Sequence, residues 1–418
     1  MVLVAVVVAL TVLAGVLAYL RRRLVRDPFT PGRSRTVAGA VLGGAFSVVV
    51  ACVLLARVGP GALARLAVPG GLGLAVTFYL LLSLLVLELP RWASRRWVRS
   101  RAVRHHGGGD GPPEDSYDRR NEAGADGLGS DVAVTEELAD PGRRHTISRV
   151  LAGTAGAVAV ATTGYGYARA RTVPTRAVTA PLARLDPAAS GLRIAVLADV
   201  HLTRGLRERS WMTETVATVN AAGVDLVAVV GDLVDGRVDE LGGFAAPLKD
   251  LDAPLGAYFV TGNHEFFSGA DEWAAFLPTV GLRVLRNERV EVTHSGVTFD
   301  LAGVDDVTGE REGSGPDLPG ALAGRDATRP VILLAHQPVL ADQASAAGVD
   351  LQISGHTHGG QMWPLHYLVR LQQGHLAGLE RVGDTVLYTS RGVGSWGPPV
   401  RVGAPPEITI LTLRSTRT

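Results

Sequence analysis

The sequence predicts an α/β layered domain that follows a helical, membrane-spanning region at the N-terminus. Two observations support this fold class. Hydrophobic residues make up 47% of the 418-residue chain, and most of the excess lies in the first 170 positions, where long apolar stretches predict helices. From Ser190 onward the chain has short β-branched runs that end in polar residues and are followed by glycine or a helical pattern. Such runs indicate a sheet buried between helical layers.

Four apolar stretches are long enough to cross a bilayer as helices, because about 20 residues cover the hydrocarbon thickness. They are Val2–Leu20, Thr36–Ala56, Val68–Leu87 and Val150–Ala168. The first three contain no charged residue and have arginine-rich flanks, which favours membrane spans over buried core helices. We therefore expect three transmembrane helices with Arg-rich loops in residues 1–106. A fourth transmembrane or signal-anchor helix is expected at 149–176.

The arginines between these stretches predict their orientation, because basic loops tend to stay in the cytoplasm. Six arginines follow the first span and six follow the third, whereas only Arg57 and Arg65 lie between the second and third. This pattern predicts a multi-pass protein of the plasma membrane with its N-terminus outside. If the fourth span crosses, the C-terminal domain lies on the outer face.

The fourth span leaves two alternatives open. Its flanking arginines are balanced, so the cytoplasmic face is the alternative location of the C-terminal domain. Arg143 and Arg144 before it resemble a twin-arginine export signal, and cleavage after the span would release the domain.

Composition further limits the organisation and the partners. Residues 107–148 are predicted to be a flexible, acidic, Gly/Pro-rich linker, because they contain few large apolar residues and cannot bury enough surface to fold. Residues 177–418 contain 28 acidic and 19 basic residues, a net charge of −9, against +1 for the whole chain. This acidic domain is not expected to bind nucleic acid. The single cysteine, Cys52, excludes a disulfide within one chain.

Five apolar runs predict the buried strands of the C-terminal domain. They span residues 193–198, 225–230, 257–260, 330–335 and 349–353. Further strands are expected at 297–302, 385–389 and 407–413, and helices at 210–222, 271–280 and 339–347. These elements predict an α/β domain with two facing sheets.

Each of the five runs is followed by residues that can bind a metal, where α/β sheets generally place their sites. In chain order these residues are Asp199, His201, Asp232, Asn263, His264, His336, His356 and His358. A single Asp-x-His or Gly-Asp pair is a weak signal, because such pairs also occur as turn caps. Two imidazoles at i and i+2 of an extended segment, however, share one face. The complete ordered set predicts a single metal centre.

This order of motifs resembles the calcineurin-like metallophosphoesterases over residues 193–413. The resemblance extends to a membrane-associated bacterial branch through Gly355-His-Thr-His-Gly-Gly-Gln361 and Arg391-Gly-Val-Gly394. It implies a four-layer αββα sandwich and two divalent metal ions. By the resemblance, one ion is held by Asp199, His201, Asp232 and His358, and the other by Asp232, Asn263, His336 and His356.

The implied centre has a simple chemical interpretation. Asp232 would bridge two cations about 4 Å apart, and the imidazole and carboxylate ligands suit Mn, Fe or Zn. Two such ions and two aspartates leave a charge of about +2, which would hold a phosphate and lower the pKa of a bridging water. Hydroxide is then the expected nucleophile. By the resemblance, His264 is the general acid that protonates the departing alcohol.

Residues around the centre carry weaker expectations. Asp235 and Glu265 either orient ligand imidazoles or are solvated turn acids. Arg391 and Arg401 either clamp the substrate phosphate or form ordinary surface pairs.

Two further histidines, His366 and His375, lie in a stretch that contains Trp, Leu and Tyr. This stretch forms either a lid near the substrate or packed structure.

The sequence therefore predicts a membrane-anchored, dinuclear-metal phosphoesterase that hydrolyses a phosphomonoester or a phosphodiester. Tethering to a membrane makes a lipid or cell-envelope phosphate the expected substrate. One alternative is a membrane-tethered sensor or scaffold that binds a phosphorylated ligand without turnover, which the intact ligand set disfavours. Another is a transporter with a regulatory domain, which is disfavoured because the only charged residue of the first three spans is Glu88, near an end, whereas transport paths usually need buried polar groups.

Overall fold

The computed structural model describes residues 2–58, 61–106 and 141–417. Most of the predicted linker, residues 107–140, lies outside the described residues. The chain divides into two compact units. One consists of Met1–Val50 and Gly73–Thr162, and the other of Ala51–Leu72 and Thr163–Thr418.

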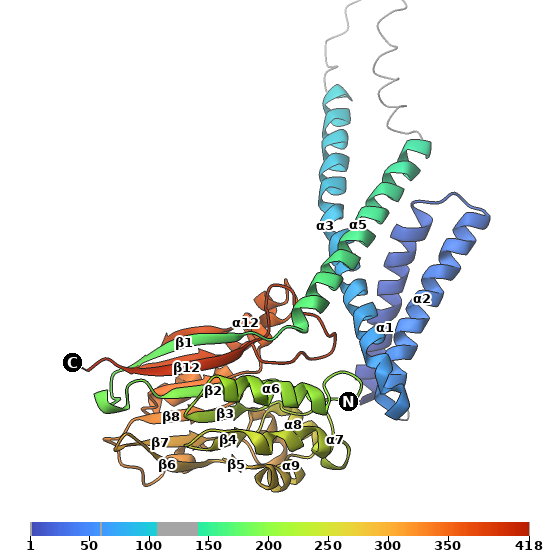
Figure 1. The fold of residues 1–418 in the computed structure, drawn as a ribbon. Coiled ribbons are helices and arrows are strands. Elements are labelled where there is room, and N and C mark those ends of the chain that lie inside the picture. The colour runs from blue at the N-terminus through green and yellow to red at the C-terminus, as the bar shows by residue number, and fades with distance from the viewer. Residues whose placement is uncertain (1, 59–60, 107–140, 418) are drawn as a thin grey trace, which may run out of the picture. The chain divides into compact units, whose positions relative to one another are not determined.

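Long helices form the N-terminal part of the chain (Figure 1). They are α1 (Val2–Arg21), α2 (Arg33–Val58), α3 (Ala67–His106) and α5 (Pro141–Ala170), with the short helices η1 (Arg22–Arg26) and η2 (Gly61–Leu66). Among the described residues, Arg33–Arg57 and Gly61–Leu89 are long and apolar enough to cross a membrane, judged by length and composition. The first and fourth predicted spans lie in α1 and α5 and stay predictions.

The bounds of α5 correct two expectations. Residues 141–148 were expected in the linker but are helical, because Pro141 has the fixed φ that suits the first turn of a helix. The helix expected over 149–176 ends at Ala170, and β1 begins at Thr175. Pro174 between them cannot continue a helix.

Two six-stranded sheets form the centre of the second unit. The first has the order β1 (Thr175–Leu182), β12 (Ile408–Ser415), β2 (Arg193–Leu197), β3 (Leu226–Val230), β4 (Ala257–Val260) and β5 (Leu282–Val284). The second has the order β10 (Gly378–Val382), β11 (Thr385–Thr389), β9 (Leu351–Ser354), β8 (Val331–Leu334), β7 (Val297–Gly303) and β6 (Glu288–His294). Strands β2 to β5 are parallel, as are β7, β8, β9 and β11, so within each sheet their carboxyl ends meet at one edge.

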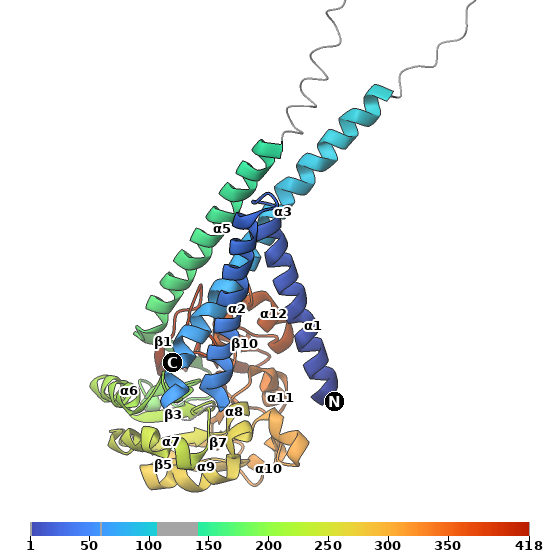
Figure 2. The same ribbon diagram turned by 90° about the vertical axis from the view of Figure 1, so that its right-hand side faces the viewer.

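Side chains that alternate along the strands build the four layers. In β3, Leu226, Ala228 and Val230 face the core between the sheets, whereas Val227 and Val229 face the helices. Figure 2 shows α6 (Arg209–Ala221) and α7 (Val238–Ala245) on one side of the strands. It shows α10 (Leu318–Ala321) and α11 (Ala341–Ala346) on the other side. Each fully buried Val or Leu stabilises this arrangement by roughly 1.5–3 kcal/mol. The predicted αββα sandwich is confirmed.

The five buried strands predicted from apolar runs correspond to β2, β3, β4, β8 and β9. The strands that were not predicted, β1, β5, β6 and β10, are the four edges of the two sheets. In β1, β6 and β10 exposed residues alternate with less exposed ones, so these edge strands contain no continuous apolar run.

Candidate metal centre

The predicted ligands lie in loops that follow buried strands. Asp199 and His201 follow β2, Asp232 follows β3, Asn263 begins α8 (Asn263–Ser268) after β4, His336 follows β8, and His356 and His358 follow β9. The fold thus brings together residues that are up to 159 positions apart in the sequence.

The ligand atoms converge in two adjoining groups. The atoms of Asp199, His201 and His358 lie within 4.8 Å of one another, and so do those of Asp232, His336 and His356. Asn263 belongs to the second group, because its Oδ1 lies 3.2 Å from His336 Nε2 and 2.9 Å from His356 Nδ1.

Asp232 lies between the two groups. Its Oδ2 is 3.3 Å from Nε2 of His336 in the second group and 3.8 Å from Nε2 of His201 in the first. This carboxylate is therefore placed to serve both groups, and the nitrogen and oxygen donors fit a pair of divalent cations.

The backbone at these ligands is strained. Eight non-glycine residues in the described part of the chain have a positive φ, and five of them are Asp199, His201, Asp232, His356 and His358. The left-handed conformation costs a non-glycine residue of order 1–3 kcal/mol and persists where the surroundings enforce it. Strain concentrated at the ligands is typical of a functional site.

Two glycines allow the backbone to approach Asp199 closely. A Cβ on Gly355 would lie 2.6 Å from Asp199 Oδ2, and one on Gly392 would lie 2.6 Å from Asp199 Cβ. Either methyl group would displace the carboxylate. Gly392 belongs to the Arg391-Gly-Val-Gly394 motif, so packing against a ligand explains part of that motif.

Hydrogen bonds orient the ligand imidazoles. His336 Nδ1 donates to the carbonyl of Val230 at 2.8 Å, which leaves Nε2 free as a ligand atom. Asp235 accepts from Nδ1 of His201 at 2.8 Å and lies 2.7 Å from Nδ1 of His264. Asp235 therefore orients two rings and is not a solvated turn acid.

Glu265 has a different role from the one expected for it. Its buried carboxylate accepts the backbone N–H groups of Asp232 and Leu233 at 2.9 Å and of Gly262 at 2.7 Å. It contacts no ligand ring through these bonds. Glu265 instead connects the Asp232 loop to the Asn263 loop.

Among the protein groups alone, the electrostatics of the two aspartates differ. Burial raises the pKa of Asp199 to about 6. Burial acts in the same direction on Asp232, but the charges of His336 and His201 outweigh it and hold the pKa of Asp232 below its ordinary value. Asp232 therefore stays ionised, as a bridging ligand requires.

The two histidines after β9 are neutral. Burial, followed by the Arg401 guanidinium, keeps the pKa of His358 well below its ordinary value. Burial and the nearby His336 lower the pKa of His356 to about 3. The neutral imidazole is the form that binds a metal.

The two arginines predicted to bind phosphate lie in different surroundings. Arg401 is only 1% exposed. Its Nη1 donates to the carbonyl of His358 at 2.7 Å and its Nε to the carbonyl of Gly394 at 2.9 Å, while its Nη2 lies 3.0 Å from Nδ1 of the His358 ring. These contacts contradict a phosphate clamp at Arg401, which positions His358 instead.

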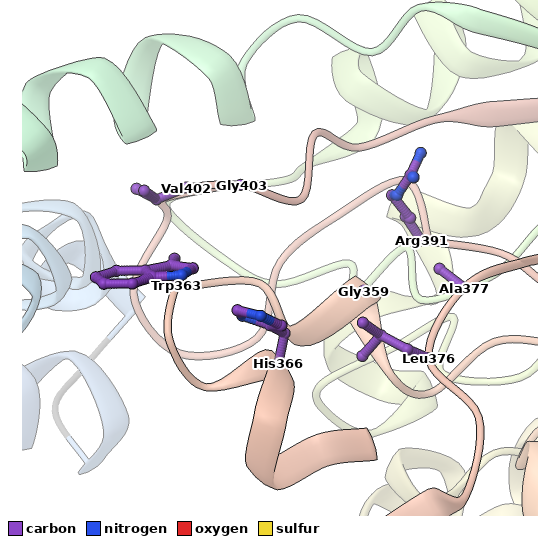
Figure 3. Close-up of a pocket in the computed structure, with 8 residues that line it drawn as sticks. All are labelled: Gly359, Trp363, His366, Leu376, Ala377, Arg391, Val402 and Gly403. Atoms are coloured by element: carbon purple, nitrogen blue, oxygen red, sulfur yellow. The ribbon is translucent and has the colours of Figure 1, made fainter.

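Arg391 pairs with Glu407 at 3.0 Å and lines a pocket of about 280 Å³ beside the centre (Figure 3). The pocket is lined by Gly359, Trp363, His366, Leu376, Ala377, Arg391, Val402 and Gly403. Gly359 directly follows His358, so the pocket adjoins the ligands. Of the two histidines in the expected lid, His366 lines this pocket, whereas His375 pairs with Glu380 at 3.0 Å.

Two aromatic residues at the site were not predicted. The ring centroids of Phe267 and Trp396 lie 5.6 and 6.2 Å from that of His264. Both side chains are exposed. A large aromatic residue within three positions of a site motif is the signal that could have identified each of them.

The chain is similar to known proteins across the second unit. The profile of the Calcineurin-like phosphoesterase family matches residues 192–360. An uncharacterized metallophosphoesterase of Helicobacter pylori is 39% identical over 232 residues, which cover 55% of this chain and 61% of that protein. A Bos taurus transmembrane protein with metallophosphoesterase domain is 39% identical over 251 residues, 57% of this chain and 56% of that protein.

An uncharacterized metallophosphoesterase of Aquifex aeolicus is 36% identical over 233 residues. The aligned region covers 54% of this chain and 87% of that protein. The chain thus spans little more than half the length of the cattle and Helicobacter pylori relatives but most of the Aquifex aeolicus relative.

Proposed function

The chain belongs to the calcineurin-like metallophosphoesterase family, and we propose that it is a membrane-anchored hydrolase of phosphomonoesters or phosphodiesters. The observation that carries this proposal is the convergence of two ligand groups on Asp232, with His264 beside them. A lipid or cell-envelope phosphate is the substrate that fits a membrane anchor.

The residues present suit two divalent ions of Mn, Fe or Zn. Asp199, His201 and His358 would hold one ion, Asn263, His336 and His356 the other, and Asp232 both. When bound, such ions supply positive charge that holds a phosphate group and lowers the pKa of a water molecule.

His264 has the surroundings of a general acid. Its Nδ1 is held by Asp235, so Nε2 is the atom that can give a proton to a departing oxygen. Nε2 lies 4.0 Å from Asp232 Oδ2, and the side chain is 14% exposed. Burial lowers the pKa of His264, but the hydrogen bond to Asp235 and the charge of Asp232 together raise it above the ordinary value. This shift favours the protonated form that a general acid requires.

The full-length protein, purified in detergent with added Mn²⁺, is expected to hydrolyse p-nitrophenyl phosphate or bis-p-nitrophenyl phosphate. A chelator should remove the activity, and Mn²⁺ should restore it. Release of p-nitrophenol measures both effects. Tight binding of two ions without cleavage of either ester would contradict the proposal and support a phospholigand sensor.

We place the catalytic unit on the outer face of the plasma membrane, as part of a multi-pass protein. The Arg-rich loops after the first and third predicted spans support this orientation. Protease added to intact cells should then digest residues 177–418. Digestion only after the cells are broken would place the unit in the cytoplasm.

A further inference from the structure

Exposed apolar side chains gather on α12 (His366–Gln373), close to the pocket. Tyr367, Leu368 and Leu371 are all exposed, Leu371 by 84%. Residues three and four positions apart on a helix lie on the same face, so Leu371 adjoins the other two. A helix that faces water normally has polar residues on that face.

Three further exposed aromatic residues lie in segments near the metal centre. Trp363, Trp396 and Phe267 are exposed. The backbone N–H of Trp396 donates to Gln361 Oε1 at 2.9 Å, and the N–H of Trp363 donates to the carbonyl of Val402 at 2.9 Å. These bonds tie the segments of the two tryptophans together. We call the set the apolar rim: Phe267, Trp363, Tyr367, Leu368, Leu371 and Trp396.

The apolar rim borders the reacting groups directly. Phe267 and Trp396 pack against the ring of His264, and Trp363 lines the pocket that begins at Gly359 (Figure 3). Any surface that covers the apolar rim therefore also lies at the entrance to the metal centre.

A helix of membrane-spanning length contacts the loop that carries Trp396, and this contact lies within one compact unit. Residues 51–72 belong to the unit that contains the metal centre. Gly71, in the candidate span Gly61–Leu89, lies against Pro399, where an added Cβ would overlap the ring. Trp396 precedes Pro399 by three residues.

The C-terminal end of α5 contacts the same loop, which carries Trp396. The carbonyl of Gly166 accepts the backbone N–H of Arg401 at 2.9 Å, and Gly166 lies against Val402. Gly71 and Gly166, which lie near the ends of two segments predicted to span the membrane, thus contact residues 399–402 within this one compact unit, next to the apolar rim.

We propose that the apolar rim docks into the lipid bilayer and presents the metal centre to a phosphate ester whose organic part lies in the membrane. Tryptophan and tyrosine favour the interface between lipid and water, and leucine favours the acyl region. The pocket beside the rim combines apolar walls with Arg391, which suits a group with one apolar and one anionic part. The part of the proposal that concerns the phosphate-ester substrate rests on the proposed function, whereas the docking of the apolar rim into the bilayer does not.

The docking is tested in the full-length protein reconstituted in vesicles. Cys52→Ser removes the single native thiol, and Leu371→Cys then carries a nitrobenzoxadiazole fluorophore. Asp326→Cys is the matched control, because Asp326 is exposed and lies before the amino end of β8, at the edge opposite the ligands. Phosphatidylcholine with a nitroxide on its acyl chain should quench the label at position 371 several-fold more than the label at 326.

Equal quenching at the two positions overturns the docking. A blue-shifted but unquenched label at 371 also overturns it, because protein, from this chain or a second copy, would then cover the apolar rim.

The substrate class has a separate test. Phosphatidic acid and phosphatidylglycerol in vesicles are compared with p-nitrophenyl phosphate and bis-p-nitrophenyl phosphate in solution. Leu368→Glu combined with Leu371→Glu should lower the ratio of vesicle to soluble hydrolysis about tenfold. An unchanged ratio, or hydrolysis of the soluble esters alone by the wild type, overturns the lipid substrate. Absence of all hydrolysis contradicts the proposed function, while the quenching still decides the docking.

Discussion

Replacing Asp232 with asparagine is expected to reduce hydrolysis by about 10³-fold or more, a loss of about 4 kcal/mol in transition-state stabilisation. The reason is that Asp232 Oδ2 adjoins ligands of both groups, 3.3 Å from His336 Nε2 and 3.8 Å from His201 Nε2. An amide is neutral and cannot bridge two cations as a carboxylate does. Metal analysis of the purified variant should therefore show fewer than two ions per chain.

A matched control separates this effect from the loss of any buried carboxylate. Asp300 is also fully buried and pairs with Arg289 at 3.2 Å, but it lies in β7, away from the ligand loops. Asp300→Asn should lower thermal stability and leave the metal content unchanged. Two tightly bound ions and normal turnover in Asp232→Asn would contradict the bridging role.

Replacing His264 with alanine is expected to lower kcat by about 10²- to 10⁴-fold, the range typical of a lost general acid. Metal content should stay near two ions per chain, since the two ligand groups around Asp232 are complete without His264. The metal content of the variant must be measured, because a nitrogen of His264 also lies within 4.8 Å of the possible ligand atoms of His201 and Asp232. Loss of an ion in the variant would make His264 a ligand.

Comparing esters with different leaving groups tests the general-acid role of His264 more directly in the His264→Ala variant. An alkyl ester requires a proton on its departing oxygen, whereas p-nitrophenolate leaves without one. The loss in His264→Ala should therefore be larger for an alkyl phosphate than for p-nitrophenyl phosphate. His294→Ala, at the end of β6, is the control that removes an imidazole outside the site.

Asp235 determines the pH range in which His264 can act. A general acid must be protonated, so activity is lost as pH rises through its pKa. Asp235 raises that pKa, and Asp235→Asn should move the alkaline limb of the pH profile to lower pH. Asp239→Asn, on the exposed surface of α7, should leave the limb in place.

The sequence alone was sufficient for the central strands and for the candidate ligands that the structure brings together. Strands buried on both faces, such as β3 and β8, contain only apolar residues, so they can be read from a short window. The ligands follow these strands within a few residues, as Asp199 follows β2. Both features are local in the chain, so they can be recognised without any knowledge of the fold.

The surroundings of the metal centre were decided only by the tertiary structure. Arg401 positions His358 from 43 residues away, and Asp235 joins His201 and His264 through bonds that span different loops. The apolar rim likewise combines residues from α8, α12 and two loops. No window of the sequence contains these partners together. The candidate residues of the site followed from the local pattern, whereas the burial, hydrogen bonding and exposure of their neighbours required the packed chain.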